Sequence, residues 1–167
     1  AEFGPAMAAA LFGMALGAAA GGWLGDRFGR ATMLFVAAFV FGVATIGAGF
    51  AHDVWSMTAV RVLGGLGFGA AFPNSMALTN DWMPQRLKAY SVATLSLGVP
   101  AGTMVTGVVV PGLMEAAGWR GVFYVFGAAS VVLAIVILAC LRESPAYLLA
   151  KGRKEAAQRA AARVLDH

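Results

Sequence analysis

The sequence predicts a polytopic, all-α membrane protein, and three features indicate this class. Of the 167 residues, 60% are hydrophobic and only 12% are charged, which is about half the charge of a typical soluble domain. The apolar residues form long runs, and a membrane-spanning helix needs about 20 of them. These runs lack the alternate-residue pattern of membrane β-barrels, so we expect a bundle of helices.

Five apolar segments are long enough to span a bilayer and make up a transmembrane region over residues 1–141. Their approximate ranges are 6–24, 31–51, 55–80, 89–113 and 121–141. In the first segment, Gly13, Gly17 and Gly21 recur at four-residue spacing, which predicts close packing of one face against a neighbouring helix.

The last segment, residues 142–167, is rich in Ala, Lys and Arg. This composition predicts a cytoplasmic, amphipathic helical linker that lies along the membrane surface and contacts anionic lipid. A solvated helical linker without a lipid contact explains the same composition equally well.

The positive charge of the chain is concentrated in three places. Of the twelve Lys and Arg residues, two lie in 25–30, two in 81–88 and six in the tail after residue 141. The positive-inside rule therefore predicts that both loops and the tail are cytoplasmic. We expect an integral protein of a bacterial inner membrane whose partner is the lipid bilayer, with no role for nucleic acid.

The residue types that carry enzyme chemistry are sparse. Cys140 is the only cysteine, and the two histidines, His52 and His167, stand alone in the sequence. No disulfide framework, thiolate metal cluster or nucleophile–base pair is apparent. We expect neither an enzyme nor a bound metal or cofactor.

The first loop reads Gly22-Trp-Leu-Gly-Asp26-Arg27-Phe-Gly29-Arg30. Its glycines allow a tight turn, and its aspartate can accept hydrogen bonds or pair with an arginine. The ordered pattern also resembles the signature between the second and third helices of the major facilitator superfamily. That resemblance implies that Asp26, Arg27 and Arg30 hold the outward-facing state together and separate when the transporter rocks inward.

The second loop, Asp81-Trp-Met-Pro-Gln-Arg-Leu-Lys88, resembles the acidic-x-x-Pro-x-x-x-basic loop of the family's sugar and organic-acid porters. The resemblance implies that its acid pairs with arginines of the first loop. Asp and Lys stand where Glu and Arg are commoner, and Lys lacks the planar fork of Arg. The predicted conformational latch comprises Gly22, Asp26, Arg27, Gly29, Arg30, Asp81 and Lys88.

Arg61 lies in the third apolar segment and is followed by glycines at 65, 67 and 69. A charge at the centre of a span costs about 2.5–3.5 kcal/mol, so it should face protein or water. Alternatively, Arg61 snorkels to the outer interface, because Trp55 is only about 9 Å away along a helix. The pattern resembles the family's fourth-helix motif, which implies that Arg61 couples transport to protons or to substrate charge.

Asn74 and Ser75 follow a proline late in the same segment. Polar groups in hydrocarbon must be satisfied, so both side chains should face the bundle or a wet cavity. Two interpretations remain open: hydrogen bonding between helices, or a place on the substrate path.

Three further elements extend the resemblance: 98–102, 118–123 and 142–153. The last contains a Glu-Ser-Pro sequence similar to the start of the central loop in sugar porters and in aromatic-acid and metabolite proton symporters. The order of elements implies helices two to six of the amino-terminal six-helix half of the fold. We expect a truncated chain, since residues 1–5 show no initiator Met and a first helix and a carboxy-terminal half are missing.

The resemblance implies secondary active transport by alternating access. The expected activity is proton-coupled uptake of a small organic or aromatic acid, with a small-molecule substrate and protons as partners. Because the substrate cavity would lie between two halves, we expect no transport by the 167 residues alone. The alternative is a non-transporting membrane scaffold derived from a half-transporter.

Overall fold

The computed structural model describes residues 4–141 and residue 143, with residues 4–7 described by their backbone alone. The described residues form four helices and no strand, which confirms the predicted all-α class. The helices are α1 (Gly4–Phe28), α2 (Arg30–Gly49), α3 (Val54–Trp82) and α4 (Lys88–Cys140). Apart from Glu143, the predicted linker over 142–167 lies outside the described residues.

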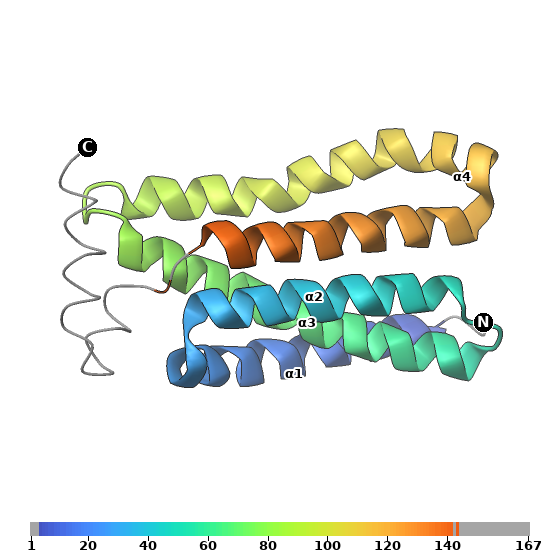
Figure 1. The fold of residues 1–167 in the computed structure, drawn as a ribbon, viewed down its shortest axis with the longest axis horizontal. Helices are drawn as coiled ribbons and strands as arrows, with labels where there is room; N and C mark the ends of the chain where they lie inside the picture. The colour runs from blue at the N-terminus through green and yellow to red at the C-terminus, as the bar shows by residue number, and fades with distance from the viewer. Residues whose placement is uncertain (1–3, 142, 144–167) are drawn as a thin grey trace.

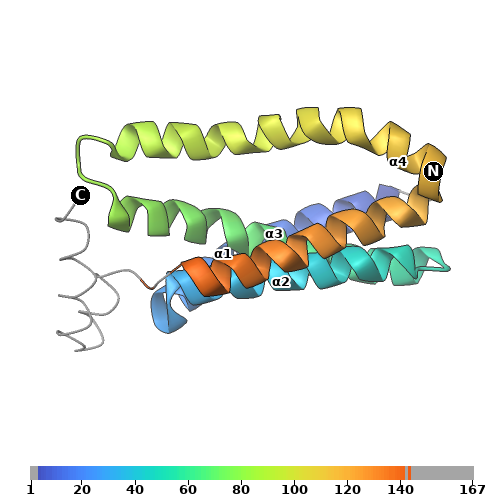
Figure 2. The same cartoon turned by 45° about the horizontal axis from the view of Figure 1, so that its top comes forward.

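Helix α4 is 53 residues long and doubles back at Gly118. The backbone there has φ 68° and ψ 178°, a conformation that glycine adopts without steric cost. Residues 88–117 form the first arm and residues 119–140 the second, and the second arm runs back from the turn in the opposite direction to the first (Figures 1 and 2). All four helices are long and apolar enough to cross a membrane. The two arms correspond to the predicted segments 89–113 and 121–141, and the division into five spans stays a prediction.

Helices α1 and α3 pack in parallel through the predicted glycine stripe. The contacts pair Gly13 with Val62, Gly17 with Leu66 and Gly21 with Ala70. A Cβ on Gly21 would lie 2.6 Å from the Cα of Ala70. The missing side chains let the two backbones touch, as small residues do between membrane helices. The structure therefore confirms the close-packed face expected from the four-residue spacing.

Helix α2 packs against the second arm of α4 in the antiparallel sense. At their crossing, a Cβ on Gly42 would lie 3.0 Å from the carbonyl oxygen of Gly127, and one on Gly127 would lie 2.9 Å from the carbonyl oxygen of Gly42. Near the carboxyl end of α2, the Tyr124 hydroxyl donates a 3.2 Å hydrogen bond to the carbonyl oxygen of Gly49. This end of the second arm is thus anchored to α2.

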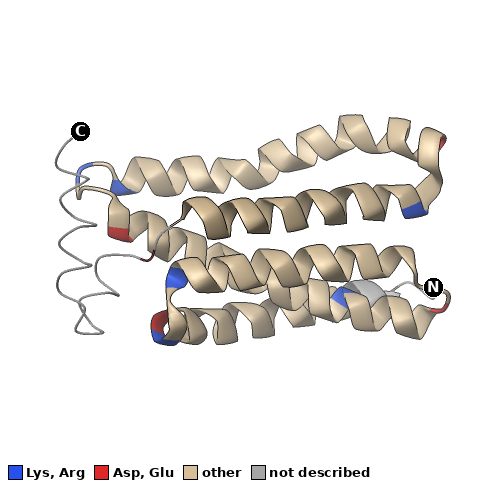
Figure 3. Cartoon of the chain, viewed as in Figure 1, with Lys and Arg blue, Asp and Glu red and all other residues tan. Residues whose placement is uncertain are grey.

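Charged residues gather at the two ends of the bundle, and the helices between are nearly free of them (Figure 3). We call the end where α1 ends and α2 begins the charged end. At the opposite end, α3 begins with a capping box formed by Asp53 and Ser56. Hydrogen bonding with Ser56 lowers the pKa of the Asp53 carboxyl from its ordinary value, because it stabilises the ionised form.

Candidate functional site

Arg30, the first residue of α2, joins three helix ends at the charged end. Its Nη1 donates to both carboxylate oxygens of Asp81 on α3 at 2.9 Å, and to the carbonyl oxygen of Ala77 at 3.3 Å. Its Nη2 donates to Asp26 Oδ1 on α1 at 3.1 Å. One planar guanidinium with several donors can serve all these acceptors at once. The structure thus brings three of the predicted latch residues into contact.

The two ion pairs of Arg30 differ in exposure. The Asp81 side chain is 17% exposed, whereas the Asp26 side chain is 70% exposed. Solvent screens an exposed pair strongly, so such pairs contribute little. The contact between Arg30 and Asp81 is therefore the stronger of the two.

Glu143 caps the amino end of α2, and sequence reasoning missed it as a site residue. Its Oε1 accepts hydrogen bonds from the backbone N–H of Thr32 at 2.8 Å and from the Thr32 hydroxyl at 2.6 Å. Its Oε2 accepts one from the backbone N–H of Ala31 at 3.3 Å. A carboxylate at this position satisfies free N–H groups and complements the positive end of the helix dipole.

Gly29 makes room for this cap. It is the N-cap residue of α2, has φ 108°, and offers no side-chain oxygen of its own. A Cβ at this position would lie 2.5 Å from the carboxyl carbon of Glu143. In contrast, a Cβ on Gly22 would meet no described atom within 4 Å. Of the two predicted latch glycines, only Gly29 is required by the contacts that the structure describes.

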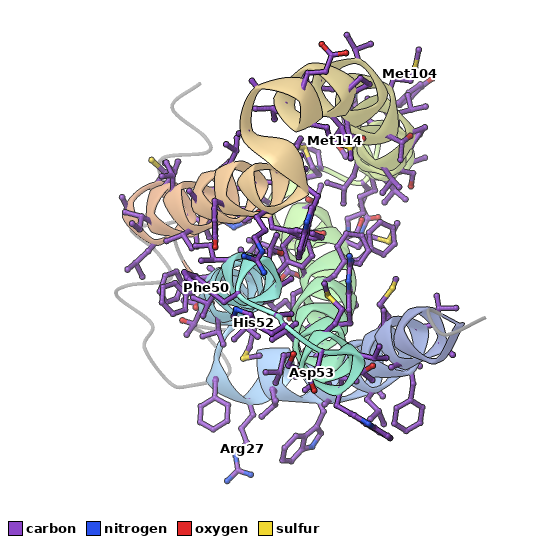
Figure 4. All side chains as sticks on the ribbon, turned by 90° about the vertical axis from the view of Figure 1, so that its right-hand side faces the viewer. Arg27, Phe50, His52, Asp53, Met104 and Met114 are labelled. Carbon is purple, nitrogen blue, oxygen red and sulfur yellow. The ribbon has the colours of Figure 1, made fainter. Side chains whose placement is uncertain are left out.

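Arg27 and Lys88 lie at the same end, but neither is among the described partners of Arg30. The Arg27 guanidinium lies 5.5 Å from the ring centroid of Trp23 and 5.8 Å from that of Phe28, both on α1. Figure 4 shows Arg27 pointing away from the helix bundle. Lys88 is half-buried at the start of α4. Within the described part of the chain, the ion pairs at this end join Arg30 to Asp26 and Asp81 and do not include Lys88.

Arg61 lies in the second turn of α3 and points towards the second arm of α4. Its guanidinium carbon is 5.2 Å from the centroid of the Phe123 ring, which is within the range of a cation–π contact. Both residues line a cavity of about 240 Å³, together with Met14 of α1, Phe41 of α2 and Phe68 of α3. The Arg61 side chain thus lies against Phe123 and lines the cavity, while the residue as a whole stays exposed.

Asn74 and Ser75, although adjacent, lie in different surroundings. Asn74 is 2% exposed, and its Nδ2 donates 2.8 Å hydrogen bonds to the carbonyl oxygens of Gly21 and Ala70. It therefore bonds α3 to α1, in line with the helix-to-helix interpretation. The Ser75 hydroxyl donates to the Phe72 carbonyl oxygen at 2.8 Å and borders a separate cavity of about 490 Å³ between α2, α3 and α4. A place for either residue on the substrate path stays a prediction.

Metal-binding groups are not assembled among the residues that the structure describes. No three His, Cys, Asp or Glu side chains within this part of the chain are placed to hold an ion. Cys140 is exposed at the last position of α4.

The chain resembles bacterial transporters of aromatic acids. It is 39% identical to the 4-hydroxybenzoate transporter PcaK of Pseudomonas aeruginosa, over 92% of this chain and 34% of the relative. It is 31% identical to a gallate transporter of Pseudomonas putida, over 90% of this chain and 34% of the relative. The chain therefore spans about a third of the length of these relatives. Because they are transporters, they favour that class over an enzyme or a scaffold.

The fold matches half of a solved transporter. Superposition on the xylose transporter XylE of Escherichia coli, in a partially occluded inward-open conformation, gives a TM-score of 0.87 at 22% identity. It covers 98% of this chain and 43% of that one. The matching part is the amino-terminal half of XylE. The model of the Major Facilitator Superfamily matches residues 1–165, nearly the whole sequence, and the chain belongs to that family.

Proposed function

We propose that the complete protein carrying this sequence is a secondary active transporter that takes up a small aromatic or other organic acid together with protons. The names of the similar transporters, which specify 4-hydroxybenzoate and gallate, support an aromatic acid as substrate. The observation that carries the proposal is the position of Arg61 in an aromatic-lined cavity.

The chemistry of this cavity suits a carboxylate attached to a ring. An arginine stays protonated and can bind a carboxylate through two parallel N–H donors. The Phe123 ring, 5.2 Å from the guanidinium carbon, has no oxygen or nitrogen acceptor, so it leaves N–H donors available for a carboxylate. Phe41 and Phe68 add apolar aromatic surface to the same cavity. Arg61 would bind substrate charge, or an acidic group whose protonation couples transport to the proton gradient.

The contacts at the charged end support the part of the proposal that concerns conformational change. Arg30 there joins the ends of α1, α2 and α3, so movement of these ends relative to one another must break its bonds. We propose that Gly22, Asp26, Arg27, Gly29, Arg30, Asp81 and Lys88 form a latch that holds one state of the alternating-access cycle. This end would face the cytoplasm across a bacterial inner membrane, and a carboxy-terminal half would complete the substrate cavity.

Uptake by the complete protein in proteoliposomes tests the proposal. With an inwardly directed proton gradient, labelled 4-hydroxybenzoate should accumulate, and a protonophore should abolish accumulation. The Arg61→Lys variant keeps the charge but removes the planar fork, so it should lose coupled uptake while still inserting into the membrane. Undiminished proton coupling in this variant would instead support snorkelling of Arg61 to the interface.

A further inference from the structure

We infer that Phe123 is a positioning residue that holds the Arg61 guanidinium in the cavity. The inference rests on the proposed role of Arg61. It starts from the 5.2 Å cation–π contact between α3 and the second arm of α4, and from the cavity that both side chains line. Phe123 does not bind the substrate anion in this scheme, because its effect passes through the arginine.

Arg61 needs such a restraint because of its place in the helix. It lies seven residues after Val54, where α3 begins, so it is about 10 Å from the helix end. An arginine at this depth has a long apolar stem and can extend its charge to the wet interface. The ring of Phe123 offers a competing position against the second arm of α4. The aromatic contact thus decides between the snorkelling position and the cavity position.

The Phe123 ring is itself held in place by the turn at Gly118. Trp119, the first residue after the turn, packs edge-on against Phe123 with ring centroids 6.1 Å apart and an interplanar angle of 85°. This is a favoured geometry for aromatic pairs. The Arg120 guanidinium lies 5.1 Å from the Trp119 ring centroid and covers it. The ring beside Arg61 therefore has a second aromatic neighbour that restrains its position.

The segment that carries Phe123 is also anchored to another helix. The next residue, Tyr124, packs its ring 5.2 Å from that of Phe50 and donates its hydroxyl hydrogen bond to Gly49 at the end of α2. Phe123 and Tyr124 thus face different neighbours, one towards Arg61 and the other towards α2. Because α2 holds the backbone here, the Phe123 ring is a fixed platform for the arginine.

The test uses the complete protein in proteoliposomes and compares Phe123→Leu with Phe123→Trp. Leucine keeps apolar bulk but has no ring face, so KM for 4-hydroxybenzoate should rise roughly 3- to 30-fold, the range of one cation–π contact. Tryptophan presents a stronger ring and should restore KM close to that of the wild type. The matched control is Phe39→Leu, which removes an exposed ring of α2 that stacks on Phe35 and contacts neither Arg61 nor the Phe123 segment; its KM should stay unchanged.

A second readout separates this inference from the transport proposal. In protein labelled with ¹⁵N-arginine, the Arg61 side-chain resonance, assigned by its loss in Arg61→Lys, should be shifted upfield by the Phe123 ring current. The shift should disappear in Phe123→Leu and persist in Phe123→Trp. An Arg61 resonance without a ring-current shift in the wild type would overturn the inference, and so would an unchanged KM in Phe123→Leu. Absence of uptake by the wild type, with the shift present, would refute only the transport proposal.

Discussion

Arg30 and Asp81, 51 residues apart in the sequence, are joined by two 2.9 Å contacts from one guanidinium nitrogen to both carboxylate oxygens. Arg30 opens α2 and Asp81 lies one residue before the end of α3. The same guanidinium reaches Asp26 near the end of α1. Three helices that are consecutive in the chain are therefore connected at one end by a single side chain.

Asp81→Asn should impair transport more than Asp26→Asn does. The Asp81 carboxylate is the shielded partner of Arg30, and loss of a charged hydrogen bond of this kind costs about 1.5–3 kcal/mol. The Asp26 pair is mostly exposed, and such pairs contribute at most about 1 kcal/mol. Initial uptake rates of the two variants of the complete protein, at matched membrane insertion, check the order. Equal rates in both variants and the wild type would contradict the latch.

Glu143→Gln should destabilise the amino end of α2. The amide keeps one acceptor but loses the charge that complements the helix dipole, an effect of about 0.3–1 kcal/mol. Thermal unfolding in detergent measures it, and raising the salt concentration should reduce the difference. Glu115→Gln, in the first arm of α4 near Gly118, is the matched control and should leave unfolding unchanged. A salt-independent or absent effect at Glu143 would argue against the cap.

Gly29→Ala and Gly22→Ala should have opposite effects on stability. Alanine at Gly29 must adopt a positive φ, which costs roughly 1–2 kcal/mol, and its Cβ would displace the Glu143 carboxylate. At Gly22 the backbone is helical and the space is open, so alanine should stabilise the helix by up to about 1 kcal/mol. Melting temperatures of the two variants provide the comparison. A neutral Gly29→Ala would show that the turn tolerates a side chain.

Asn74→Ala should lower stability and leave substrate affinity nearly unchanged. Its buried side chain donates one hydrogen bond to Gly21 of α1 and one to Ala70 of its own helix. Loss of the amide leaves the Gly21 carbonyl oxygen without this donor, at a cost of about 1–3 kcal/mol. Ser75→Ala removes a hydroxyl that bonds within its own helix and should not change stability. Thermal unfolding and KM measured on the same preparations separate the two interpretations. A raised KM at wild-type stability would support the substrate path.

The 167 residues expressed alone should insert into membranes without transporting 4-hydroxybenzoate. The chain spans about a third of the length of its relatives, and major facilitator transporters bind substrate between two halves. Counterflow in proteoliposomes is the measurement, with the complete protein as the positive control. Proton-coupled uptake by the isolated chain would show that it forms a closed cavity unaided.

The close contact between α1 and α3 was predictable because it depends on a local pattern. The spacing of Gly13, Gly17 and Gly21 repeats with the helical period, so it marks one face of α1 regardless of the rest of the fold. The pattern did not predict which helix would pack against this face. The pairing of Arg30 with Asp81 was predictable for another reason, the resemblance of both loops to family signatures.

Glu143 escaped prediction because its partner, Thr32, is 111 residues away in the sequence. The Glu-Ser-Pro motif was visible, but nothing in the local pattern says which helix end the carboxylate reaches. One signal was present: α2 begins after a glycine, which has no side-chain oxygen to cap it. The first backbone N–H groups of such a helix can then be capped by an acceptor from elsewhere in the chain.

The sequence by itself determined that this is a helical membrane protein with charge at the helix ends. Burying polar groups in a bilayer is costly at every position, so this cost is visible directly in the composition. It also determined the family, through ordered motifs. Only the tertiary structure decided that Arg61 lies over Phe123 and that Glu143 caps α2. Both contacts depend on α4 turning at Gly118 and returning along α2, and long-range proximity of this kind follows from the path of the whole chain.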